Sequence, residues 1–192
     1  MQHQPNSDDE GARKKARVVD VFKREVWQQC RFALMAAENL QQWVREGHNE
    51  RVFQSLQSFL SAAASISRLL GGEGEIRTQV RADLGATEDS LKRMRKLRNH
   101  FEHFDERLEE WVKRDPRLNI VDMGMFGPGD IAGLDASSSF FRNLDPNTYI
   151  ATFWDEEFDL KAAVRAVEEL EQKAKPETVR LSEALQAQAE AS

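Results

Sequence analysis

The residues best suited to chemistry stand close together in the middle of this 192-residue chain, in the segment Arg98-Asn99-His100-Phe101-Glu102-His103. Histidine exchanges protons near neutral pH, so His103 is suited to general acid or base work. Arginine is permanently charged and fork-shaped, so Arg98 is suited to binding a phosphate and stabilising charge that develops on it. This pair, with Asn99 to orient the histidine or the phosphate, favours attack of a ribose 2′-hydroxyl on its own phosphate without a metal ion.

The segment lies in a predicted helix of about residues 88–113. Its apolar residues recur at helical spacing and are expected to face a core: Leu91, Met94, Leu97, Phe101, Phe104, Leu108 and Trp111. At about 100° per residue, Arg98 and His103 lie roughly 140° apart and flank one polar face. Arg95, His100 and Glu102 are the supporting candidates on or beside that face. One histidine and one arginine are few for phosphoryl transfer, and a symmetric dimer would double both in a shared cleft.

An arginine, a polar residue and then a histidine, late in a long helix, resemble the signature of the HEPN superfamily (higher eukaryotes and prokaryotes nucleotide-binding). Residues 97–108 are also similar to uncharacterised bacterial HEPN-like proteins, and the resemblance extends over about residues 18–175. It implies an antiparallel helical bundle. It further implies a metal-independent endoribonuclease whose motifs, here Arg98, Asn99 and His103, meet across a homodimer interface. Such proteins are often toxins or defence proteins, so an antitoxin protein is a further implied partner.

Two features depart from that family pattern. Members controlled by a nucleotidyltransferase carry a tyrosine two positions after the histidine, where this chain has Asp105, so we do not expect that control. Glu102, Asp105 and Glu106 also place acid around the motif, where it can pair with Arg95 and Arg98 or repel RNA. The alternative is therefore a non-catalytic helical module that uses this face to dimerise or to bind a protein or a nucleotide, with Arg98 and Glu102 as an ordinary salt bridge.

Metal and cofactor sites are not predicted. His100 and His103 could in principle hold a metal with Asp105 or Glu106, but the other histidines give no second cluster of ligands. The same residues are the basis for a third, weaker possibility, a metal-dependent hydrolase. The glycine-rich stretches 71–74 and 127–133 lack the spacing of phosphate-binding loops, and we interpret them as ordinary loops.

Composition limits the choice of partners and compartment. The net charge is −6, which opposes strong nonspecific binding to nucleic acid. An RNA-binding surface must therefore be a local basic patch, or the binding must be transient, and no DNA partner is expected. No apolar stretch is long enough to cross a membrane and no secretory signal is apparent. The single cysteine, Cys30, fits a reducing compartment, which we take as the cytoplasm, and its place in a helical stripe predicts core packing.

The remaining elements give a mainly α fold, a HEPN-like antiparallel bundle with a small β-hairpin insertion before the last helix. We expect a disordered tail over residues 1–15 and a single domain over 16–175, followed by a polar tail or frayed helix over 176–192. Within the domain, helices are predicted over about 18–46, from an N-cap at Asn49 to Leu70, over 76–84, and from an N-cap at Thr87 through 88–113. The hairpin region, about 119–155, contains short strands at 119–125, 140–144 and 149–154, with a turn at 145–147. The last helix begins near Asp159 and ends before Pro176.

Overall fold

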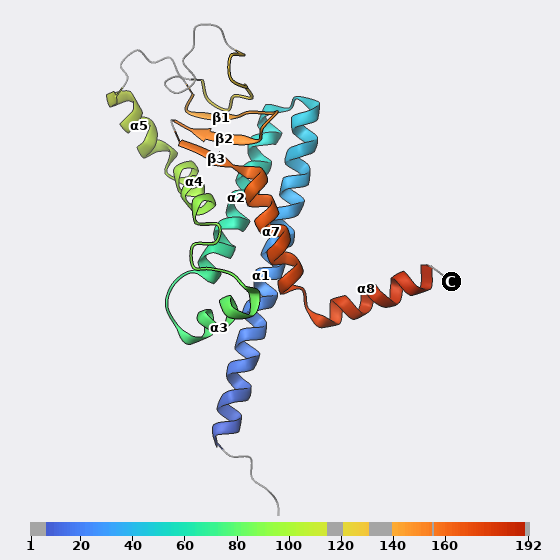
Figure 1. Cartoon of the computed structure of the whole chain (residues 1–192). Coiled ribbons are helices and arrows are strands. Elements are labelled where there is room, and N and C mark those ends of the chain that lie inside the picture. The colour runs from blue at the N-terminus through green and yellow to red at the C-terminus, as the bar shows by residue number, and fades with distance from the viewer. Residues whose placement is uncertain (1–6, 115–120, 131–139, 155, 191–192) are drawn as a thin grey trace, which may run out of the picture.

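The computed structural model describes residues 7–114, 121–130, 140–154 and 156–190, and most of these residues are helical. The helices are α1 (Ser7–Glu46), α2 (Asn49–Leu70), α3 (Glu75–Leu84), α4 (Lys92–Glu102), α5 (Phe104–Arg114), α7 (Leu160–Ala174) and α8 (Glu177–Glu190). The strands are β1 (Arg142–Leu144), β2 (Ile150–Phe153) and β3 (Glu156–Asp159), which form one antiparallel sheet. The mainly helical class with a small sheet before the last long helix is therefore confirmed (Figure 1).

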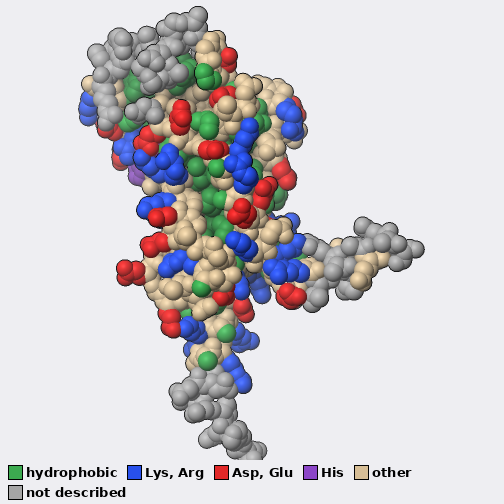
Figure 2. All heavy atoms as spheres, viewed as in Figure 1, with side chains coloured by type: hydrophobic (Ala, Val, Ile, Leu, Met, Phe, Trp, Pro, Cys, Tyr) green, Lys and Arg blue, Asp and Glu red, His purple; other side chains and the backbone are tan. Residues whose placement is uncertain are grey.

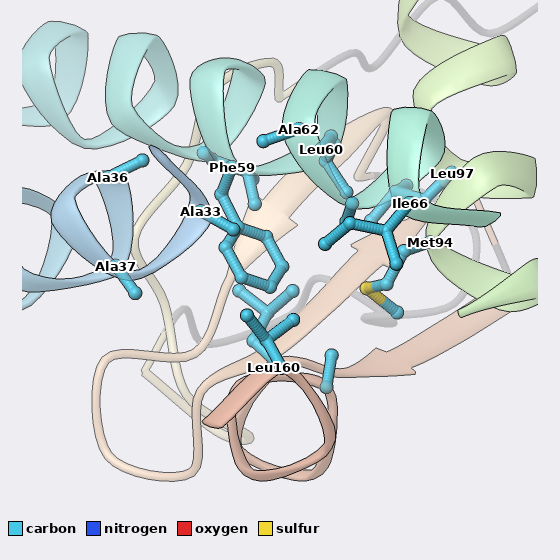
Figure 3. Packing of buried hydrophobic residues seen from close by; sticks show 14 of the residues in the cluster. Ala33, Ala36, Ala37, Phe59, Leu60, Ala62, Ile66, Met94, Leu97 and Leu160 are labelled. Atoms are coloured by element: carbon cyan, nitrogen blue, oxygen red, sulfur yellow. The ribbon is translucent and has the colours of Figure 1, made fainter. Parts of the chain in front are cut away.

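The core is centred on the hairpin of α1 and α2. Small residues let these two helices approach closely, and Figure 3 shows Ala33, Ala36 and Ala37 of α1 near Phe59 of α2. Helix α7 packs on α1 and helix α4 packs on α2, so the four helices enclose a continuous cluster of buried apolar side chains. Cys30 belongs to it, with no exposed surface, which confirms its predicted role in core packing. Burial raises the pKa of its thiol to about 12, with the nearby Glu171 carboxylate adding to the effect.

Helix α1 begins earlier than predicted, at Ser7 instead of near Val18, so residues 7–15 are helical and the expected disordered tail is wrong over that range. The remainder of that tail, residues 1–6, lies outside the described residues. No proline interrupts this segment, and Glu10 and Lys14 have the four-residue spacing of a favourable helix pair. Lys15 forms an ion pair with Glu75 of α3 and so ties the extension to the rest of the chain.

Both predicted N-caps before α2 and α4 are wrong. His48 is the residue that precedes α2, and Asn49 uses its side-chain amide to donate to the carbonyl of Met123 at 3.3 Å. Thr87 and Ser90 form a local turn instead of a cap, and α4 begins only at Lys92, after Leu91 in the left-handed region at φ 58°. Gly47, at φ 72°, ends α1 as predicted.

Arginines of α3 complete the end of α2. The last carbonyls of a helix lack intrahelical partners. Arg77 donates to the carbonyl of Gly71 at 2.7 Å, and Arg81 donates to the carbonyl of Leu70 at 2.7 Å. The linker between α2 and α3 is therefore held by side chains of the helix that follows it.

The sheet differs from the predicted one by its third strand. β1 and β2 form the expected hairpin, and Asp145 in the turn accepts hydrogen bonds from the backbone of Asn147 and from the hydroxyl of Thr148. Burial alone would raise the pKa of Asp145, but these hydrogen bonds lower it. Strand β3 was not predicted because Phe158 is its single apolar side chain. Asp159 accepts from the backbone of Ala162 and caps α7 where that helix was predicted to begin.

A segment expected to be a strand instead runs alongside β1 with two isolated bridges. The described part of it, from Val121, pairs with Phe140 and places Gly124 opposite Asn143, both in parallel. The Asn143 side chain then donates to the carbonyl of Phe126 at 2.9 Å and accepts from its backbone N–H at 3.1 Å. Residues 119 and 120 of the predicted strand lie outside the described residues.

Residues 177–190 are helical, and residues 191 and 192 of the predicted tail lie outside the described residues. Helix α8 extends away from the bundle in Figure 1, so the expectation of a polar tail gives way to its alternative, a further helix. In the described part of the chain, no helix combines the length and the apolar character that crossing a bilayer would require.

Candidate functional site

Helix α4 carries a local concentration of positive charge in an acidic chain. Five cationic side chains stand between residues 92 and 98, namely Lys92, Arg93, Arg95, Lys96 and Arg98. Several of them are engaged within the protein: Lys92 pairs with Asp89 at 2.7 Å, Lys96 with Glu156, and Arg93 donates to the carbonyl of Glu157 at 2.5 Å. The local basic patch that RNA binding would require is thus present in the sequence of α4, although much of its charge already has partners.

Arg98 is half-buried beside the acid that follows it by one turn. Its Nη2 atom forms an ion pair with the Glu102 carboxylate, and its side chain is 25% exposed. Its Nε atom is buried and has no hydrogen-bond partner among the described residues. An i,i+4 pair of this kind is worth only about 0.3–0.5 kcal/mol. The guanidinium therefore loses little when it turns away from Glu102 toward another anion.

His103 lies at an interruption between α4 and α5, so the single helix predicted over 88–113 is wrong. Its backbone, at φ −99° and ψ 39°, leaves the helical region at this one residue. The hydrogen-bond ladder nevertheless continues, because the N–H of His103 donates to the carbonyl of Asn99 at 3.0 Å and its carbonyl accepts from Arg107 at 3.0 Å. The His103 ring is 54% exposed, and its Nδ1 lies 3.5 Å from the Glu106 carboxylate.

Asn99 is exposed one turn before His103. Within the described part of the chain, its side-chain amide makes no hydrogen bond with the His103 ring, so the direct contact that the spacing allows is not formed. The structure brings Arg98, Asn99 and His103 onto neighbouring turns outside the core. Arg98 lies beside Glu102, and His103 lies beside Glu106.

His100 is not the exposed helper that the polar face suggested. Its side chain is only 12% exposed and its ring stacks on Phe153 at 4.7 Å between ring centres. Burial lowers the pKa of His100, which Arg107 and Lys96 reinforce, whereas Glu156 and Glu110 oppose it. Neither ring nitrogen has a hydrogen-bond partner among the described residues. His100 therefore connects α4 to the sheet as an aromatic side chain.

Aromatic rings of the sheet region pack against the joint between α4 and α5. Phe153 contacts Phe101 of α4 at 6.3 Å between ring centres, and Phe141 meets Phe104 of α5 edge-on at 5.1 Å. Arg142 of β1 lies over the Phe104 ring at 4.5 Å. It is fixed there by two hydrogen bonds to the Asp122 carboxylate, at 2.7 and 2.6 Å. We name this group of rings the aromatic platform: His100, Phe101, Phe104, Phe141, Phe153, Trp154 and Phe158.

Arg95 is the cation of α4 least engaged by the protein. It is half-buried near Gly71, and the described part of the chain gives its guanidinium no hydrogen bond or ion pair. The expected pairing of Arg95 with the acids that follow it is therefore not formed. As a supporting residue it has a free charge one turn before Asn99.

Sequence reasoning missed the residues that position the site from the sheet. Glu156 lies 3.7 Å from His100 and pairs with Lys96, and Phe153 supports the same turn of α4. They stand more than fifty positions away from α4 in the chain. No local pattern joins such distant residues, so only the packing of the sheet against the helix reveals them.

Two further observations concern other kinds of site. In the described part of the chain, no group of three or more histidine, cysteine or acidic residues is arranged to hold a metal ion. A cavity of about 390 Å³ lies away from the motif, between α1, α2 and α7, with Leu40, Phe59 and Val164 among its walls. None of its lining residues belongs to the candidate site.

Comparison of this chain with protein-family models, with curated proteins and with solved structures gives no match.

Proposed function

We propose that this chain is a metal-independent endoribonuclease of the HEPN type that acts as a homodimer, with Arg98, Asn99 and His103 of both protomers lining one cleft. The observation that carries the proposal is the placement of His103. It stands exposed at the interruption between two helices, one turn after Asn99, and the half-buried Arg98 lies on the preceding turn of α4. This arrangement places a proton-exchanging ring and a guanidinium outside the core on adjoining turns.

In the proposed reaction, the 2′-oxygen of a ribose attacks the adjacent phosphorus and the bond to the 5′-oxygen of the next nucleotide breaks. His103 of one protomer takes the proton of the 2′-hydroxyl, and the partner's His103 gives a proton to the departing 5′-oxygen. The products are a 2′,3′-cyclic phosphate and a 5′-hydroxyl. Arg98 stabilises the negative charge on the phosphate oxygens, and Arg95 binds a neighbouring phosphate. No cofactor takes part.

In the isolated chain, the ion pair with Glu102 keeps Arg98 from binding a phosphate. Glu102 competes with phosphate for the same guanidinium, and the pair is worth little on the surface. RNA binding or dimerisation that supplies another anion, or removes Glu102, would free Arg98. An antitoxin protein that stabilises the Arg98–Glu102 pair would instead keep Arg98 from the phosphate.

The decisive experiment is incubation of the purified protein with transfer RNA and total RNA in excess EDTA. We expect cleavage that leaves cyclic phosphate ends, a loss of at least about a hundredfold in His103→Ala and Arg98→Ala, and faster cleavage in Glu102→Gln. His48→Ala is the matched control, because His48 is also exposed and also lies near a glutamate, 3.8 Å from Glu46. A folded dimer that cleaves no RNA, or an equal loss in His48→Ala, would contradict the proposal.

A second candidate is a non-catalytic helical module that uses the same face to dimerise or to bind a protein or a nucleotide. The acidic partners of Arg98 and His103 favour it, since they neutralise the two groups that catalysis needs. It predicts that Arg98→Ala and His103→Ala shift the monomer–dimer equilibrium in sedimentation while RNA stays intact. Normal dimerisation of both variants would show that this face does not mediate dimerisation.

A further inference from the structure

Four large apolar side chains of α1 point away from the bundle. Val18, Val21, Phe32 and Met35 are 41%, 62%, 47% and 56% exposed, whereas Val19 beside them is buried. None of the four contributes to the buried core or to the candidate site. Exposed apolar residues that occur singly are common, but a row along one helix indicates a contact surface.

The spacing of this row is that of a coiled coil. The steps from Val18 to Val21 and from Phe32 to Met35 are three residues, and Glu25 and Gln28 fill the positions between them at alternating steps of four and three. These are the two inward positions of a seven-residue repeat. The row occupies the middle of a 40-residue helix, which is about 60 Å long.

The row is also complementary to an antiparallel copy of itself. A second copy of α1 running antiparallel, with the symmetry axis between residues 26 and 27, places Val18 opposite Met35 and Val21 opposite Phe32. Each small side chain then faces a large one, which suits close packing. The same alignment sets Glu25 against Gln28, whereas a parallel pair would set the Glu25 carboxylates of both copies against each other.

We propose that α1 associates with α1 of a second copy of this chain as an antiparallel coiled coil through Val18, Val21, Phe32 and Met35. In this alignment Arg17 faces Glu38 at both ends of the seam, and these charges attract. Arg24 faces Arg31 nearer the centre, which opposes association, although Arg31 also lies 5.2 Å over the Trp27 ring. The charges at the ends favour the antiparallel direction and the central arginines oppose it, so the matched apolar pairs and the separation of the two Glu25 carboxylates decide the direction.

The surface beside the row suits a helical partner. A groove of about 320 Å³ runs between α1 and α2 next to Phe32 and Met35, and its lining side chains are uncharged. The Ser58 hydroxyl on its α2 wall donates to the backbone carbonyl of Gln54 at 3.0 Å, which partly satisfies its polarity. The N-terminal part of the partner's α1, which projects beyond the bundle in Figure 1, would lie along this groove.

This contact does not rest on the proposed ribonuclease. Helix α4, which carries Arg98, packs on α2, and the exposed row lies on α1. Figure 2 shows one face of the molecule, on which charged side chains surround the apolar ones. Loss of the α1 contact and loss of RNA cleavage are therefore separate outcomes.

The test is disulfide trapping between full-length variants under mild oxidation. Val18→Cys and Met35→Cys are prepared separately and then mixed. We expect a covalent dimer in the mixture and none in either variant alone, because only the antiparallel alignment joins residue 18 to residue 35. Cys30 does not compete, since it is buried and its high pKa keeps it a thiol. A covalent dimer within Val18→Cys alone, or none in the mixture, would overturn the proposal.

Sedimentation of single variants provides a second measurement that does not require oxidation. Phe32→Glu is expected to weaken self-association by more than about tenfold, because it places a charge in the seam. Val112→Glu is the matched control, since Val112 of α5 is 45% exposed but lies outside the row. Arg17→Glu should also weaken association, and Glu38→Arg in the same chain should restore it. Equal behaviour of Phe32→Glu and Val112→Glu would contradict the α1 seam.

Discussion

The α1–α2 hairpin and the α4–α5 joint are both helical, yet they are stabilised in different ways. The hairpin uses small residues such as Ala33 and Ala63, which have no exposed surface, so that two long helices lie close together. The joint has an interruption at His103 and depends on aromatic rings supplied by the sheet. The hairpin is therefore specified by neighbours in sequence. The joint, which carries the candidate site, takes its position from residues far along the chain.

The largest effect is expected from removing a ring from each region. Phe59→Ala in the hairpin and Phe153→Ala in the aromatic platform each remove a side chain that is 1% exposed, and each should cost about 3–5 kcal/mol of unfolding free energy. Only Phe153→Ala should also increase hydrogen exchange in residues 97–107, because His100 and Phe101 rest on that ring. Hydrogen exchange with mass spectrometry checks this. An equal increase in both variants would mean that the joint has no separate support.

A smaller change in unfolding free energy is expected when the pH is lowered. Burial holds the pKa of His100 below its ordinary value of 6.5, so the unfolded chain binds a proton more readily than the folded one. Stability from this residue is complete above pH 6.5 and falls as the pH is lowered toward the folded pKa, by at most about 1.4 kcal/mol per pH unit. His100→Phe should flatten this slope in urea titrations between pH 7 and 5. An unchanged slope in His100→Phe would show that other groups cause the acid loss.

The smallest effect is expected at the ion pair beside the motif. Glu102→Gln removes the partner of Arg98, and the loss of unfolding free energy should be only about 0.3–0.5 kcal/mol. Glu177→Gln, which removes a partner of Arg180 at 3.9 Å, should cost no more. Chemical denaturation of both variants gives the comparison. A loss above about 1 kcal/mol in Glu102→Gln would mean that the pair holds α4 in place and does not merely restrain the arginine.

The two regions also differ in how far the sequence predicts them. The existence and the C-terminal ends of the two hairpin helices, the glycine that ends α1 and the start of α7 near Asp159 follow from local patterns, and the structure confirms them. The break at His103 was missed because the apolar stripe continues through Phe101, Phe104 and Leu108. Periodicity indicates which face is buried but does not show that the backbone bends.

The candidate site was predicted as a set of residues on one face, and its surroundings were not. Arg98, Asn99 and His103 do lie outside the core, and the salt bridge to Glu102 is formed. His100 was misplaced because the residues that cover it, Phe153 and Glu156, belong to a sheet whose third strand has almost no sequence signature.

The side-chain amide of Asn143 has a consequence for assembly. By pairing with both backbone groups of Phe126, it continues the contact between β1 and the segment that runs beside it. An open strand edge invites another chain to add a strand, which leads to aggregation or to β-augmentation. Here the β1 edge is covered by a segment of the same chain. The apolar row of α1 and the polar face of α4 are the helical surfaces that offer a partner a different kind of contact.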